Sequence, residues 1–151
     1  MIDYSKLRQA LSHLEKQYHN YQHLDASLPS ITQEAVAESV IQRFETCWDC
    51  LWKVVKRYLN QELGLPEVPN SPKPIMRLAG DNLLLGREQP QQAVEQWLGY
   101  AAARIATSHD YSGEKAQQAL LLMSSFVPAA IALYEQMSGE QWQQISAEGG
   151  K

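Results

Sequence analysis

The stretch from Thr32 to Leu63, TQEAVAESVIQRFETCWDCLWKVVKRYLNQEL, decides the fold of this 151-residue chain. Its apolar residues recur at spacings of three and four, which is the period of an α-helix. They form two stripes instead of one, so we expect a helix that packs on more than one side and lies at the centre of the fold. Gly64 is the predicted end of this helix. The first stripe holds Val40, Phe44, Cys47, Leu51, Val54 and Tyr58, and the second holds Ile41, Trp48, Trp52, Val55 and Leu59.

Four further helices are expected around the central one. The first has the same apolar spacing from Tyr4 and ends near Pro29, and another begins at Ser71-Pro72 and runs to about Leu85. The remaining two cover about residues 90–109 and 113–137. We therefore predict an all-α fold, an antiparallel up-and-down bundle of four to five helices that forms one domain over residues 1–151, with a frayed tail at 140–151.

The charge balance restricts the partners that the chain is expected to bind. Thirteen basic and seventeen acidic residues give a formal net charge of −4. This argues against non-specific nucleic-acid binding, so we expect no DNA partner, whereas a local RNA contact stays open. The apolar run 116–134 contains polar residues and a proline, so we interpret it as a buried helix and expect no membrane contact. The N-terminal residues lack the apolar core of a secretion signal, which favours the cytoplasm and reduced cysteines.

Two pairs of residues have spacings found at metal or redox sites. Cys47 and Cys50 form a C-x-x-C pair, but they lie inside a predicted helix with no second cysteine pair, so Cys47 is interpreted as a small buried hydrophobe and Cys50 as partly exposed. His19 and His23 share one helix row with Glu15, and ligands from a single row cannot surround a metal ion. We expect a solvated helix face there, and neither a metal nor a cofactor.

Polar residues in two other places are candidates for function. Lys53, Lys56 and Arg57 form a basic patch that is either a solvated edge at a helix C-terminus or a contact for RNA or a partner. Arg104 shares a helix row with Trp97 and Ala101 and is expected on an inward or interface face, where a guanidinium is costly unless it is paired or used.

His109 follows Arg104 by five positions, about 140° around an ideal helix. The two side chains can meet where the helix ends between them, or across a two-fold dimer. Together they would suit a phosphodiester, because arginine stabilises the charge on phosphate and histidine transfers protons near neutral pH. The alternative is that Arg104 pairs with a buried carboxylate and His109 caps the helix end.

Arg104, His109 and Tyr111 together resemble the R-x4-H-x-Y signature of the HEPN superfamily, small helical bundles that include prokaryotic ribonuclease toxins. Over about residues 41–134 the chain is similar to the nucleotidyltransferase substrate-binding family within that superfamily. The stretches that carry this similarity are 41–45, 51–53, 56–59 and 71–73, followed by Arg77 and Trp97.

The resemblance implies a homodimer around the Arg-His motif and a minimal nucleotidyltransferase encoded nearby, the two proteins forming a toxin–antitoxin module. It makes Arg104 and His109 the ribonuclease residues and Tyr111 the target of adenylyl transfer. Ile105 departs from the pattern, since active members generally carry a polar residue after the arginine. We therefore expect a helical partner subunit of a two-component nucleotidyltransferase system, and the alternative is a metal-independent ribonuclease toxin.

Overall fold

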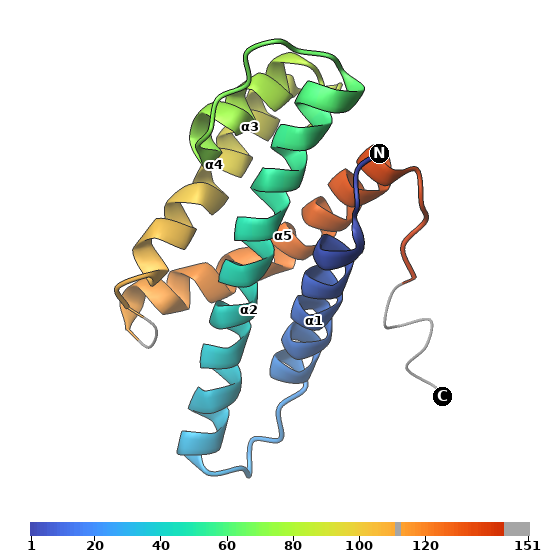
Figure 1. Ribbon diagram of the computed structural model, residues 1–151. Coiled ribbons are helices and arrows are strands. Elements are labelled where there is room, and N and C mark those ends of the chain that lie inside the picture. Colours follow the sequence, from blue (N-terminus) through green and yellow to red (C-terminus); the bar gives the residue numbers. More distant parts are fainter. Residues whose placement is uncertain (111–112, 144–151) are drawn as a thin grey trace.

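The computed structural model describes residues 1–110 and 113–143, which fold into five α-helices without a strand among them. The central helix is continued by a π-helical turn, η1 (Tyr58–Glu62). The predicted all-α bundle is confirmed (Figure 1). In chain order the helices are α1 (Ser5–Gln22), α2 (Ser30–Arg57), α3 (Pro72–Asp81), α4 (Pro90–Thr107) and α5 (Glu114–Ser138).

Helix α2 is the centre of the bundle, as its two apolar stripes predict. It forms an antiparallel hairpin with α1, and it also contacts α3, α4 and α5, with α5 crossing behind it in the view of Figure 1. Most of both stripes is buried, and Trp52 and Tyr58 lie at the edge of the core. Gly64 takes a φ of +68° where the chain leaves the helix, a conformation that favours glycine.

Aromatic rings join three helices in the middle of the core. The ring of Phe126 in α5 lies 5.0 Å from that of Phe44 in α2 and 5.0 Å from that of Tyr100 in α4. Trp48 and Trp97 stack at 6.1 Å beside them. All five rings are almost fully buried, so they contribute a large apolar area to the packing of α4 and α5 on α2.

Helix α3 is shorter than the sequence predicts. It ends at Asp81 instead of continuing to Leu85, because the chain turns at Leu83, which has a left-handed φ of +61°. Before this turn α3 lies very close to α4. A Cβ atom on Gly80 would come within 2.0 Å of Cγ2 of Val94, so glycine is required for this contact.

The two ends of the described chain meet at one end of the bundle (Figure 1). The Tyr4 hydroxyl donates to the carbonyl of Met137 at 3.1 Å, and Arg8 pairs with Glu140 at 3.0 Å. The indole N–H of Trp142 donates to Glu15 at 3.1 Å. Residues 140–143 are therefore bound to α1, and the rest of the predicted frayed tail, 144–151, lies outside the described residues.

Helix α5 is long and apolar enough to cross a membrane by length and composition. Half of its most apolar 18-residue window is buried inside the protein, where Met123, Phe126 and Ala130 face the core. This burial is typical of the core helix of a folded bundle, as the sequence interpretation of residues 116–134 requires.

Candidate functional site at the end of helix α4

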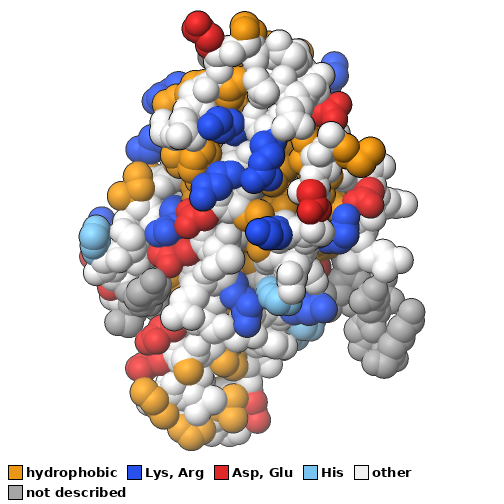
Figure 2. Space-filling model, viewed as in Figure 1, with side chains coloured by type: hydrophobic (Ala, Val, Ile, Leu, Met, Phe, Trp, Pro, Cys, Tyr) orange, Lys and Arg blue, Asp and Glu red, His pale blue; other side chains and the backbone are white. Residues whose placement is uncertain are grey.

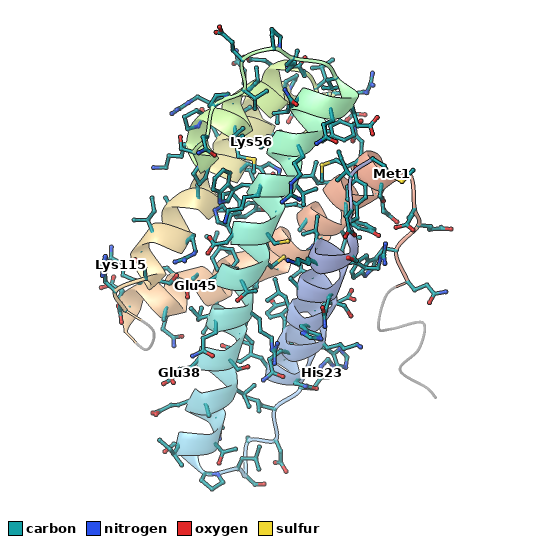
Figure 3. All side chains as sticks on the ribbon, viewed as in Figure 1. Met1, His23, Glu38, Glu45, Lys56 and Lys115 are labelled. Atoms are coloured by element: carbon teal, nitrogen blue, oxygen red, sulfur yellow. The ribbon has the colours of Figure 1, made fainter. Side chains whose placement is uncertain are left out.

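Arg104 is bound to α2 by two carboxylates. Its Nε and Nη2 donate to the two carboxylate oxygens of Asp49 at 3.2 and 3.1 Å, and its Nη1 donates to Oε2 of Glu45 at 3.2 Å. The first pair is the bidentate geometry that gives arginine–carboxylate contacts their specificity. Figure 3 labels Glu45 on α2, and the side chain of this residue is 10% exposed, against 47% for Asp49.

The same carboxylate also fixes the last turn of α4. Thr107 is completely buried, and its hydroxyl donates to Oε2 of Glu45 at 2.8 Å. A buried carboxylate that accepts hydrogen bonds from a hydroxyl and a guanidinium has its charge compensated. Glu45 therefore binds both Arg104 and Thr107 and holds the last turn of α4 on α2.

Asp110 connects the end of α4 to the start of α5. Its carboxylate accepts hydrogen bonds from the backbone amides of Gly113 at 2.7 Å and Lys115 at 3.2 Å. A negative charge at a helix N-terminus is favourable, because free N–H groups point toward it. The carboxylate lies so close to Gly113 that a Cβ there would approach its oxygens to 2.6 and 2.7 Å.

The predicted site residues are placed as follows. Arg104 faces inward beside the buried Trp97 and Ala101, as its helix row predicts, and it is paired with a buried carboxylate, as the structural alternative predicts. His109 is exposed in the turn that follows α4. Tyr111 lies outside the described residues. The catalytic role of Arg104 and His109 and the modification of Tyr111 therefore stay predictions.

The partners of Arg104 were not identified from the sequence. Asp49 and Glu45 precede it by 55 and 59 positions, so no local pattern links them. One signal was present in the central helix. The second apolar stripe passes from Ile41 to Trp48 with a carboxylate, Glu45, in the apolar position between them. A charged residue inside a buried stripe requires a partner from another helix.

An apolar groove borders the site between α2, α3 and α4. Its volume is about 570 Å³, and Arg104 forms part of its wall. Ile105 is 59% exposed at this groove, a large exposure for an apolar side chain next to a paired arginine. The other apolar residues that line it are Trp48, Pro72, Pro74 and Ala101.

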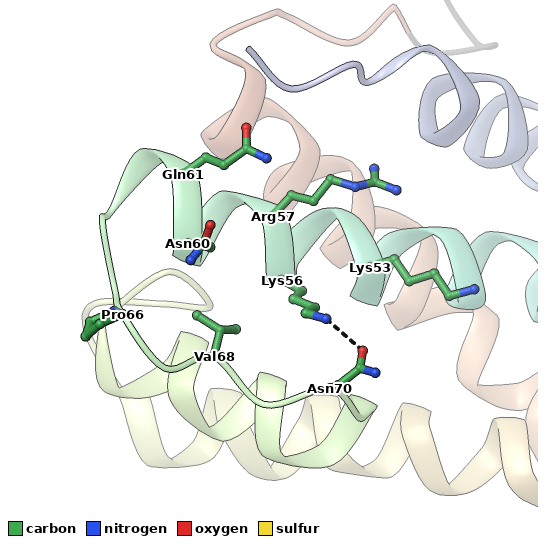
Figure 4. Close-up of a pocket in the computed structure, with 8 residues that line it drawn as sticks. All are labelled: Lys53, Lys56, Arg57, Asn60, Gln61, Pro66, Val68 and Asn70. Carbon is green, nitrogen blue, oxygen red and sulfur yellow. Dashed lines mark hydrogen bonds between the residues drawn. The ribbon is translucent and has the colours of Figure 1, made fainter.

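The basic patch lines a cavity at the end of α2. Lys53, Lys56 and Arg57 all line this cavity; Lys56 points toward the loop and donates to Oδ1 of Asn70 at 2.8 Å, whereas Arg57 extends from the other side of the helix (Figure 4). The three residues thus lie together, as the sequence predicts.

The cysteine and histidine pairs have the environments expected for them. Cys47 is fully buried, and burial raises the pKa of its thiol; Cys50 is half-buried, and burial raises its pKa although Arg57 and Lys53 oppose that change. His19 and His23 are exposed on α1 with ring centres 4.2 Å apart.

Comparison with known proteins places the chain in a family. The family model described as "Nucleotidyltransferase substrate binding protein like" matches residues 2–139. A curated relative from Haemophilus influenzae, named "Probable ribonuclease HepT", is 30% identical over 111 residues, which are 72% of this chain and 72% of the relative.

A solved structure has the same fold. This crystal structure of a protein from Thermus thermophilus superposes with a TM-score of 0.70 at 24% identity, covering 87% of this chain and 98% of the other. This structure therefore has the same helix arrangement as the one described above. The family model covers residues 2–139, which include all five helices. The chain belongs to the family of nucleotidyltransferase substrate-binding-like proteins, as its resemblance to the HEPN superfamily implies.

Proposed function

We propose that this protein is the helical partner subunit of a two-component nucleotidyltransferase system of the toxin–antitoxin type, acting in the cytoplasm. The observation that carries the proposal is the pairing of Arg104 with Glu45 and Asp49 within a chain of this family. The carboxylates of Glu45 and Asp49 neutralise the positive charge of Arg104 that would otherwise bind a phosphodiester, and they hold the end of α4 in place. The end of α4 is then held at a defined position on α2 that a partner can recognise.

In this proposal Tyr111 is the residue that the partner modifies. Its phenolic oxygen attacks the α-phosphorus of ATP, a P–O–tyrosine bond forms, pyrophosphate leaves, and the phenolic proton passes to solvent. Coexpression with the nucleotidyltransferase encoded nearby should yield a stable complex and a mass increase of one or more adenylyl groups. Tyr111→Phe should abolish the mass increase and keep the complex. Failure of the wild-type chain to copurify with the partner, or an unchanged mass increase in the variant, would contradict the proposal.

We further propose that two copies associate through the apolar groove beside Arg104. The exposure of Ile105 and the apolar residues around it support a protein contact at this position. Sedimentation should show a dimer for the wild type and a monomer for Ile105→Glu, because a charge would be buried without a partner. Leu121→Glu is the matched control, since Leu121 is 78% exposed and does not line this groove.

A second candidate function is ribonuclease activity, and the relative named as a probable ribonuclease favours it. His109 would transfer protons, and Arg104 would contact phosphate after exchanging one of its bonds to the exposed carboxylate of Asp49. Expression of the chain alone should then arrest growth, and His109→Ala should remove the arrest while the fold is kept. Harmless expression of the wild-type chain would count against this function.

A further inference from the structure

The cavity at the end of α2 has a composition that differs from the rest of the surface. Its volume is about 510 Å³, within the range of small-molecule sites. None of the described residues that line it is acidic, in a chain whose net charge is −4. Figure 2 shows Lys and Arg side chains gathered in the central part of the face where α2 lies. The lining consists of Lys53, Lys56, Arg57, Asn60, Gln61, Pro66, Val68 and Asn70.

The three cations of this cavity have no acidic partner among residues 1–110 and 113–143. The ion pairs in that part of the chain involve Arg8 and Arg104 instead. Lys56 is fixed by a neutral amide, that of Asn70, which also joins the loop to α2 (Figure 4). The positive charges of Lys53 and Arg57 are therefore available for an anion from outside.

We propose that this cavity binds the phosphate groups of a nucleotide, either free or within a short RNA strand. Arginine and lysine are the usual phosphate ligands, and charge-assisted bonds from them are stronger than neutral ones. The amide of Gln61 can donate to and accept from a sugar or base, Oδ1 of Asn60 can accept while its nitrogen donates to the carbonyl of Leu65, and the nitrogen of Asn70 can donate while its oxygen accepts from Lys56.

A neighbouring cavity provides a comparison within the same protein. It shares Lys53 and Arg57 and adds Lys6, but Asp3 and Asp49 also line it. Carboxylates in the wall repel phosphate and reduce the local positive potential. The phosphate site is therefore assigned to the cavity that Lys53 and Arg57 line together with Lys56 and Asn70.

The test is titration calorimetry of the full chain with ATP, with adenosine as the phosphate-free probe. The double variant Lys53→Gln, Arg57→Gln keeps the Lys56–Asn70 bond, and it should weaken ATP binding at least about tenfold. The matched control Lys16→Gln, Arg77→Gln removes the same charges from positions outside this cavity and should bind ATP as the wild type does. Unchanged urea midpoints show that both variants are folded.

Equal losses in the two variants, or adenosine binding as tightly as ATP, would overturn the proposal. A short single-stranded RNA forms the second arm of the test. If RNA binds more tightly than ATP, and its binding is weakened by the double variant and by salt, the ligand is an RNA strand. If ATP binds more tightly than RNA and the double variant weakens its binding, the ligand is a free nucleotide. If neither probe distinguishes the variants, the site does not exist. This inference goes beyond the proposed function, because copurification with the nucleotidyltransferase is a separate readout that the double variant can retain.

Discussion

At the scale of single residues, Glu45 and Asp49 hold the same guanidinium in different surroundings. Glu45 accepts from Arg104 and from the buried hydroxyl of Thr107, and its side chain is 10% exposed. Asp49 is bidentate but 47% exposed, so water can replace its contacts. Removing a buried carboxylate leaves its hydrogen-bond donors unsatisfied and costs much free energy of folding. Removing an exposed carboxylate costs little, because water replaces it.

We therefore expect Glu45→Ala to lower the free energy of unfolding by about 3 kcal/mol. Asp49→Ala should lower it by less than about 1 kcal/mol. Urea denaturation followed by circular dichroism measures both. Glu45→Gln is the control, because an amide oxygen can still accept from Thr107, and its loss should be intermediate. Equal losses for the two alanine variants would contradict the unequal roles assigned here.

At the scale of helices, α3 and α4 are in contact at Gly80, a residue that has no side chain. A Cβ on Gly80 would overlap Cγ2 of Val94. Gly80→Ala should lower the free energy of unfolding by roughly 1–3 kcal/mol, because the two helices must move apart. Gly99→Ala in α4 is the matched control: nothing lies within 4 Å of the Cβ added there, so alanine should stabilise the helix by about 0.5–1 kcal/mol.

Thermal unfolding measures both glycine variants, and the double variant Gly80→Ala, Val94→Ala tests the cause. Removing the methyl groups of Val94 should recover part of the loss. A loss in Gly80→Ala that Val94→Ala does not change would assign the effect to another contact.

The helices were predictable to different degrees. The stripes of α2 and the glycine that follows it are local signals, so the helix and its approximate extent could be predicted, but spacing did not indicate that the α-helix ends at Arg57 and continues as the π-helical turn Tyr58–Glu62. The end of α3 depends on a left-handed Leu83, a conformation that the sequence does not indicate for leucine. The site was half predictable. Arg104 could be placed on an inward row, but its partners lie 55 and 59 positions earlier, and helix packing alone brings them together.

At the scale of the whole molecule, the segment after α5 closes the bundle through Glu140. The hydroxyl of Tyr134 and the guanidinium of Arg8 both donate to this carboxylate. These hydrogen bonds, that of Tyr134 first, lower the pKa of Glu140 below its ordinary value of 4.5. The contacts therefore stabilise the folded chain fully above that ordinary value, and the contribution is lost as the pH falls through the lower folded pKa.

Acidification from neutral pH through the lowered folded pKa of Glu140 should accordingly release residues 140–143. Trp142 reports the release, because its ring packs 5.3 Å from that of Tyr134. The difference in fluorescence between the wild type and Trp142→Phe isolates its signal and should shift to longer wavelength below the pKa. Glu140→Gln should show the released signal at every pH. A transition that persists in Glu140→Gln would assign the change to Glu15 or Glu135, which also bind Trp142.

The position of Phe126 in α5 affects the order in which the core can form while the chain is being synthesised. Trp48 and Trp97 are synthesised well before α5, yet their shared pocket closes only when Phe126 arrives. During synthesis, the indole rings of Trp48 in α2 and Trp97 in α4 would thus stay partly exposed to solvent until α5 leaves the ribosome. Such an interval attracts chaperones, and translation pauses between α4 and α5 would be expected to lower the yield of native protein.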